Sequence, residues 1–309
     1  RDLNALREQQ QRPGVRYRFT NQYSRALEEI GTPEVVPILT ARLTEVDFGF
    51  AAALVLKHLA DRENGRSDQT SAAHWPNFAA AAQRRLEKAD ARAESDAPPA
   101  DAIFNAVAQL RREGSTDREK QLALSVAKVG VMLPHADHRE DIDALLQMPF
   151  RAERLGLLLA LVSDGETVSA DVVLAGIDEF FDAARTAPWM LQEHLFELEE
   201  WLALLPFSDR PEIVIETVGR LPDQIRHPRN LHRLLSALAH APGPSLRILL
   251  ELAGRDASFY GEYEWLQALK ARREQAAVKE LLDLLADGKV AGRRGGIDTW
   301  SLARELAGR

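Results

Sequence analysis

Hydrophobic positions in the last third of the chain form two patterns that alternate and repeat. The first is an apolar run that begins at Trp201 and returns at Leu234 and Trp265. The second begins at Val214 and returns at Leu249 and Leu281. Two apolar patterns that each return after about 31–35 residues are typical of stacked helix pairs. We therefore expect an all-α fold, an α-solenoid of stacked antiparallel helix pairs.

Helical spacing of apolar residues continues through most of the chain. It predicts helices at about 17–30, 33–44, 47–61, 75–91, 100–113, 117–132, 138–147, 151–163, 169–185, 188–205, 210–221, 228–240, 244–254, 258–271, 274–287 and 298–307. No stretch alternates apolar and β-branched with polar residues for long enough to indicate a strand. The predicted helix 151–163 is apolar on nearly all sides, so we expect neighbouring helices to bury it.

The paired prolines of residues 94–99 indicate a linker or loop, because proline ends helices. We therefore divide the chain into N-terminal HEAT-like helices at 1–93, this linker, and a helical repeat array at 100–309. The helix 298–307 has one apolar stripe and is expected to cap the array, with Trp300 packed on the helix 274–287. Because the sequence begins with Arg1 rather than Met, we expect it to be part of a longer chain.

Residues 26–60 resemble a HEAT repeat. A helix ends in the turn Gly31-Thr32-Pro33-Glu34, and a second helix begins with Val36-Pro37-Ile38-Leu39. A short loop with Asp47 and an Ala-rich helix follow. The departure is Phe48-Gly49-Phe50, where HEAT repeats commonly place a Val-Arg pair, and the later repeats are shorter than usual. The resemblance implies divergent HEAT-like repeats.

The stretch from Leu246 to Asp256, continued by Tyr263 to Leu266, is similar to HEAT-like arms of bacterial STAND/NACHT-type signalling ATPases. This resemblance implies a sensor or scaffold arm of a bacterial protein. The chain contains no Gly-x-x-x-x-Gly-Lys-Ser/Thr loop. We therefore expect any ATPase to lie outside this sequence, and we expect no cofactor here.

Charge and composition narrow the possible partners. The net charge is −8, and residues 137–209 carry 16 acidic and 4 basic side chains, a net of −12. Such an acidic middle repels a nucleic-acid backbone. The chain has no cysteine, which rules out disulfides, cysteine-bound metals and a thiol nucleophile and fits a cytoplasmic location. No apolar run reaches the ~18 residues of a membrane span.

One cluster has the composition of a metal site. His135 and His138 are three residues apart, with carboxylates nearby at Asp137 and Glu140. The same residues also suit a helix start in which Asp137 is the N-cap and Glu140 completes a capping box. We favour the helix start and expect no bound metal.

A second cluster is acidic, with carboxylates at Glu193, Glu197, Glu199 and Glu200. Acid–base chemistry would need two of them in a pocket. Because an apolar stripe opposes them on the predicted helix 188–205, we expect a solvated face instead. With no recognisable catalytic motif, no catalytic residue is assigned.

The repeat itself places charged residues at equivalent positions. These are the acidic residues Glu216, Glu251 and Asp283 and the basic residues Arg220 and Arg255. Equivalent positions in a solenoid form a stripe, which is a candidate interaction surface. The pairs 216/220 and 251/255 also have the i,i+4 spacing of helix-stabilising ion pairs.

The sequence therefore predicts a non-catalytic protein-interaction scaffold or sensor arm with a protein partner. The alternative is an enzyme, because some HEAT-like proteins are DNA glycosylases that act on alkylated bases. The five tryptophans would suit that alternative, whereas the acidic middle opposes it.

Overall fold

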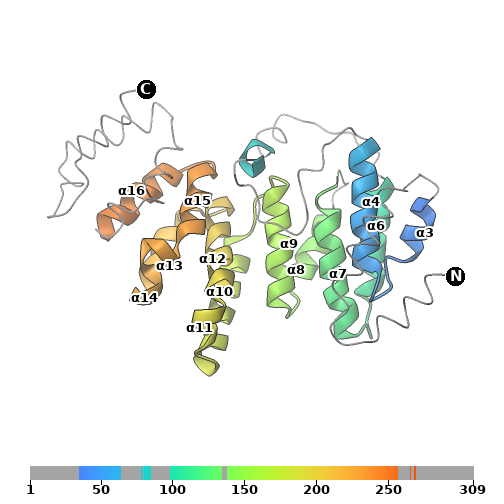
Figure 1. The fold of residues 1–309 in the computed structure, drawn as a ribbon, viewed down its shortest axis with the longest axis horizontal. Helices are drawn as coiled ribbons and strands as arrows, with labels where there is room; N and C mark the ends of the chain where they lie inside the picture. Colours follow the sequence, from blue (N-terminus) through green and yellow to red (C-terminus); the bar gives the residue numbers. More distant parts are fainter. Residues whose placement is uncertain are drawn as a thin grey trace. The chain divides into compact units, whose positions relative to one another are not determined.

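The computed structural model describes residues 35–63, 78, 80–84, 98–133, 138–256, 265 and 268 (Figure 1). These residues are mostly helical, which confirms the predicted all-α class. Within these ranges no β-strand forms, and the sole β-bridge is an isolated parallel one between Val168 and Ser208. No helix in the same ranges is long and apolar enough to cross a membrane.

The chain divides into two compact units. The first consists of Arg1–Trp75 and Ala93–Ala160, and the second of Pro76–Arg92 and Leu161–Arg309. The division falls inside helix α9 (Arg151–Ser163), whose bounds match the predicted helix and which is largely buried, as expected. Residues 94–97 of the predicted linker lie outside the described residues, so the proposed division at 94–99 stays a prediction.

In the first unit, α4, α6 and α7 pack on one another, α3 packs on α4, and α8 packs on α7. The bounds are α3 (Val36–Ala41), α4 (Gly49–Glu63), α6 (Pro98–Leu110), α7 (Asp117–Gly130) and α8 (Arg139–Leu146). A capping box starts α7, because the Thr116 hydroxyl accepts from the Glu119 amide and the Glu119 carboxylate accepts from the Thr116 amide. The pKa of Glu119 is lowered because its carboxylate accepts hydrogen bonds from the Thr116 amide and from the Thr116 hydroxyl.

The described part of residues 26–60 forms two of the expected helices, α3 and α4. At its point of departure, a Cβ on Gly49 would overlap the carbonyl oxygen of Leu43. Glycine is therefore required where the chain turns tightly between the two helices. The preceding helix, predicted at 17–30, lies outside the described residues.

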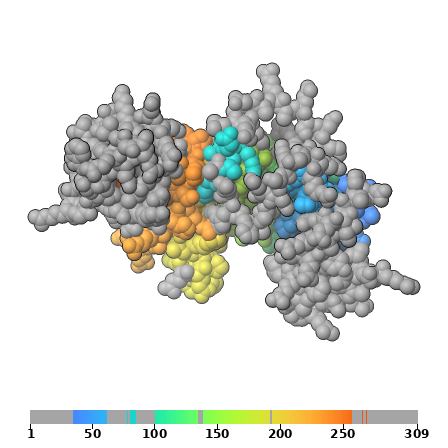
Figure 2. Space-filling view, turned by 45° about the horizontal axis from the view of Figure 1, so that its top comes forward, coloured from blue at the N-terminus to red at the C-terminus, as the bar shows by residue number. Residues whose placement is uncertain are grey.

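The second unit contains the elements α10 (Ala170–Thr186), α11 (Met190–Glu193), α12 (Leu195–Leu204), η2 (Leu205–Phe207), α13 (Ile213–Arg220), α14 (Asp223–Arg226), η3 (Pro228–Asn230), α15 (His232–His240) and α16 (Ser245–Arg255). The repeated apolar runs fall on α12 and α15 and on α13 and α16. α12 packs on α10 and on α15, while α16 packs on α13 and on α15. The surface of these elements runs from yellow to orange in Figure 2.

The repeated apolar positions form the core of this unit. Trp201, Leu234 and Trp265 are all fully buried. A Cβ on Gly176 of α10 would overlap the indole ring of Trp201, so α10 and α12 approach closely at this point. The indole Nε1 of Trp265 donates to the carbonyl of Leu249 at 3.0 Å.

A segment distant in sequence completes the second unit. Residues 78 and 80–84 are helical, and the ring of Phe78 stacks on that of Phe207 at 5.3 Å between centroids. The guanidinium of Arg84 donates to the carbonyl of Ser163 at 2.7 Å. The described part of 76–92 therefore packs with elements that follow it only much later in the chain.

Three helix predictions in this unit are wrong in detail. The predicted helix 188–205 is broken at His194 into α11 and α12, and the predicted helix 210–221 starts only at Ile213. The predicted helix 228–240 is interrupted at Leu231, between η3 and α15. The short helix α14 was not expected. The predicted cap with Trp300, the helices 274–287 and 298–307, and all of 258–271 except Trp265 and Ala268 lie outside the described residues.

Candidate functional site

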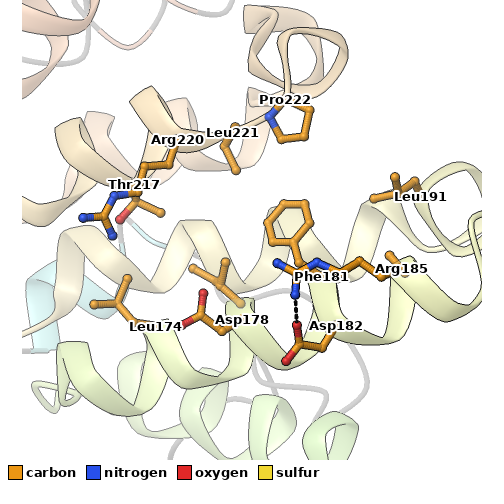
Figure 3. A pocket seen from close by; sticks show the side chains of 12 residues that line it. Leu174, Asp178, Phe181, Asp182, Arg185, Leu191, Thr217, Arg220, Leu221 and Pro222 are labelled. Atoms are coloured by element: carbon orange, nitrogen blue, oxygen red, sulfur yellow. Dashed lines mark hydrogen bonds and ion pairs between the residues drawn. The ribbon is translucent and has the colours of Figure 1, made fainter.

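A groove of about 710 Å³ lies between α10 and the C-terminal end of α13. We call it the α10–α13 groove (Figure 3). All of its lining residues belong to the second unit. It is half open to solvent, and its walls are mostly apolar.

One face of α10 forms the long wall of the groove. The lining side chains of this helix begin at Leu174 and end at Arg185, with Ile177 and Phe181 between them at helical spacing. This stretch spans three helical turns, or about 16 Å. Ile177 is buried in the floor, whereas Leu174 and Phe181 are half-buried. The groove is therefore elongated along the helix.

The opposite wall is shorter. Thr217 and Arg220 come from the last turn of α13, and Leu221 and Pro222 come from the residues that follow. The ring of Phe181 points from α10 toward Leu221 and Pro222 (Figure 3). The Thr217 hydroxyl is satisfied by the carbonyl of Ile213 at 2.9 Å, so it adds no free polar group to the wall.

The charged side chains at the rim of the groove differ in whether they have an ion-pair partner. Arg185 is paired with Asp182 at 2.6 Å within α10, and Arg220 is paired with Glu216 within α13. Asp178, in the middle of the α10 wall, is exposed and makes no hydrogen bond or ion pair with the residues that the structure describes. Within that part of the chain, the groove therefore presents one unneutralised negative charge beside its apolar floor.

A second polar feature lies between α12 and α15, and we call it the Glu199–Arg233 cluster. The Oε2 atom of Glu199 is 3.0 Å from Nδ1 of His232 and 3.6 Å from Nε of Arg233. The Arg233 guanidinium is 3.2 Å from Oε1 of Glu200 and lies 3.5 Å over the ring of Phe196. Apart from His232 and Phe196, these side chains are largely buried.

Burial dominates the electrostatics of this cluster. Desolvation raises the pKa of Glu199 to about 7, although the positive charge of Arg233 opposes the shift. Desolvation also lowers the pKa of Arg233 to about 10, against the attraction of Glu200 and Glu199. A carboxyl group that titrates near neutral pH can hold or release a proton, but none of these residues lines the α10–α13 groove.

The expected solvated face of carboxylates is therefore wrong for two of its four members. Glu193 is exposed and Glu197 is half-buried, whereas Glu199 is only 7% exposed and Glu200 pairs with Arg233. The reason is that α12 is covered by α10 on one side and by α15 on another. The repeat could have revealed the partners, because the step from Trp201 to Leu234 also leads from Glu199 to His232 and from Glu200 to Arg233.

The repeat also predicted two ion pairs among the residues of its charged stripe. Arg220 pairs with Glu216, and Arg255 pairs with Glu251 at 2.8 Å, so both predicted i,i+4 pairs are confirmed. They lie on α13 and α16, which pack together. Asp283 lies outside the described residues, and the interaction surface stays a prediction.

The metal-like cluster is only partly described, since His135 and Asp137 lie outside. The His138 ring stacks on Phe104 at 4.0 Å between centroids, and its Nε2 atom is 3.2 Å from Oδ1 of Asp101. The N-cap of α8 is His138 rather than the expected Asp137, with no side-chain cap bond. In the parts of the chain that the structure describes, no three His, Cys, Asp or Glu side chains are grouped as a metal site would need.

Comparison with known proteins assigns this chain to no family. No protein-family model, no curated protein and no solved structure matches this chain.

Proposed function

We propose that this chain is a non-catalytic protein-interaction scaffold or sensor arm, built as a divergent HEAT-like stack of helix pairs. The observation that carries the proposal is the register between α12 and α15. Side chains one repeat apart in sequence meet across these helices, Glu199 with His232 and Glu200 with Arg233. The same step relates the apolar runs at Trp201 and Leu234.

Register of this kind supports a repeat because equivalent positions in a solenoid lie side by side. The packing of α13 on α16 adds support, since these helices carry the second repeated pattern. Repeat stacks present extended surfaces and commonly bind other macromolecules on them. The half-open α10–α13 groove is such a surface, with apolar side chains accessible to a partner.

Affinity capture from the source cell, followed by quantitative mass spectrometry, tests this function. The full chain is used as bait at micromolar concentration, and a variant with Trp201→Ala, which disrupts the stack, is the matched control. We expect at least one protein to be recovered by the wild-type chain alone and to bind it when both are purified. Recovery of no specific protein in repeated experiments would refute the proposal.

A further inference from the structure

We propose that the α10–α13 groove binds an amphipathic helix of a protein partner and that a lysine or arginine of that helix pairs with Asp178. This inference rests on the proposed function, because it names the chemistry of the partner and the place where it binds. Three observations carry it: the shape of the groove, its apolar floor and the unneutralised charge of Asp178.

The shape of the groove favours a rod over a compact ligand. Small-molecule sites enclose most of the ligand and direct several polar groups into it. Here the lining side chains follow α10 for three turns, the space is half open, and the charged groups stand on the rim. A helix of about eleven residues has the same length of about 16 Å.

The chemistry of the walls also favours a helix over an extended strand. An extended peptide binds by adding main-chain hydrogen bonds to a sheet edge, whereas both walls here are built from helices and the residues directly after one. Helical partners instead insert apolar side chains at i, i+3 or i+4, and i+7. Leu174, Ile177 and Phe181 have the complementary spacing on α10.

The charges at the groove favour an amphipathic helix that carries basic residues over one that does not. Both arginines at the groove are already paired within their own helices, with Asp182 and with Glu216. Asp178 is the group that remains for a partner within the part of the chain the structure describes. Residues 137–209 also carry a net charge of −12. A basic flank is therefore favoured, both in the contact itself and in the approach of the partner.

A display selection with a defined peptide library tests the proposal. The library consists of helical peptides long enough to fill the groove, with apolar residues at i, i+3, i+4 and i+7 and random residues elsewhere. It is selected on the full wild-type chain and counter-selected on Phe181→Ala, whose half-buried ring can be removed without emptying the core. Circular dichroism and a thermal melt establish that the variant is folded.

The expected result is enrichment of peptides that carry lysine or arginine beside the apolar stripe. Their affinity for Phe181→Ala should be lower by about tenfold or more, because central apolar anchors dominate such interfaces. Asp178→Asn should weaken them by about two- to fivefold, the range of a partly exposed ion pair. Asp143→Asn, which removes the same charge from an exposed position of α8, should change nothing.

A charge exchange gives the sharpest outcome. Replacing the selected lysine of the peptide with glutamate should weaken its binding to the wild-type chain. The same glutamate peptide should bind the Asp178→Lys variant well, because the two charges have been exchanged. The groove proposal is overturned if no peptide distinguishes wild type from Phe181→Ala, or if selected peptides are acidic or indifferent to Asp178. Capture of a protein partner that binds these variants normally would overturn the groove alone and leave the proposed function standing.

Discussion

The helices α10 and α12 lie side by side in the second unit, yet their surroundings differ. α12 is enclosed, with α10 against Trp201 and α15 against Glu199 and Glu200. α10 shares one face with α12, but its other face is open along the groove. Across the groove from α10, which has 17 residues and is about 25 Å long, stands only the last turn of α13, a helix of 8 residues and about 12 Å.

The largest effect is expected from truncation inside the enclosed region. Trp201→Ala removes a fully buried ring between α12 and α10 and should lower the free energy of unfolding by about 3–5 kcal/mol. Phe181→Ala, in the open groove, should cost about 1 kcal/mol, because that ring is only half-buried. Urea denaturation of the two variants measures both values. Equal losses would show that the groove is as closed as the core.

A smaller effect is expected from Arg233→Met, which keeps the length of the side chain but removes its charge. Glu199 and Glu200 would then lose their guanidinium partner across α12 and α15, at a cost of about 2–3 kcal/mol. Adding Glu199→Gln should recover about 1 kcal/mol, because a neutral amide is less costly to bury than an unpaired carboxylate. A double-mutant cycle measures this coupling. Strict additivity would contradict it.

Substitutions of two helical glycines test the difference between the closed contact of α10 with α12 and the open surroundings of α13. Gly176→Ala should destabilise by about 1–3 kcal/mol, because the new methyl group would overlap Trp201. Gly219→Ala on α13 meets nothing within 4 Å and should instead stabilise by about 0.5–1 kcal/mol. Opposite signs in thermal melts would confirm the contrast, and a loss at both positions would refute it.

The last effect concerns pH. The pKa of Glu199 is raised to about 7 in the folded chain, so the folded state binds more protons than the unfolded state between about pH 4.5 and 7. The contribution of Glu199 to stability is therefore complete below pH 4.5 and is lost as pH rises through 7. We expect a loss of about 1–2 kcal/mol, less than the full shift implies, because water reaches part of the cluster.

This pH effect can be isolated by comparing variants. Denaturation at pH 5 and pH 8 should show a smaller decrease in stability for Glu199→Gln than for the wild type. Glu193→Gln removes a carboxylate from the exposed end of α11 and should leave the wild-type decrease unchanged. An unchanged pH dependence in Glu199→Gln would show that another group is responsible.

Local sequence patterns predicted the helices well but not their surroundings. Spacing within a single helix can be read from the sequence alone. It predicted the bounds of α9 and the ion pairs Glu216–Arg220 and Glu251–Arg255. The burial of Glu199 depends on α15, a helix that begins only at His232. The α10–α13 groove is lined by residues from α10, from the last turn of α13 and from the chain after it, and no pattern within α10 indicates it.

The break at His194 has a similar origin. Its flanking residues keep helical apolar spacing, so the sequence favours one continuous helix from 188 to 205. The structure instead ends α11 at Glu193 and begins α12 at Leu195, where the His194 ring lies 5.7 Å from that of Trp189. Hydrophobic periodicity alone therefore does not predict a helix break of a single residue.

The stacking of Phe78 on Phe207 has a consequence for how the second unit folds. Glu200 and Arg233 close a loop of one repeat, whereas this aromatic pair closes a loop roughly four times as long. The longer closure costs about 1 kcal/mol more in chain entropy. Contacts with large sequence separation also slow folding. Residues 78 and 80–84 should therefore dock onto a preformed α10–α16 core as a late step.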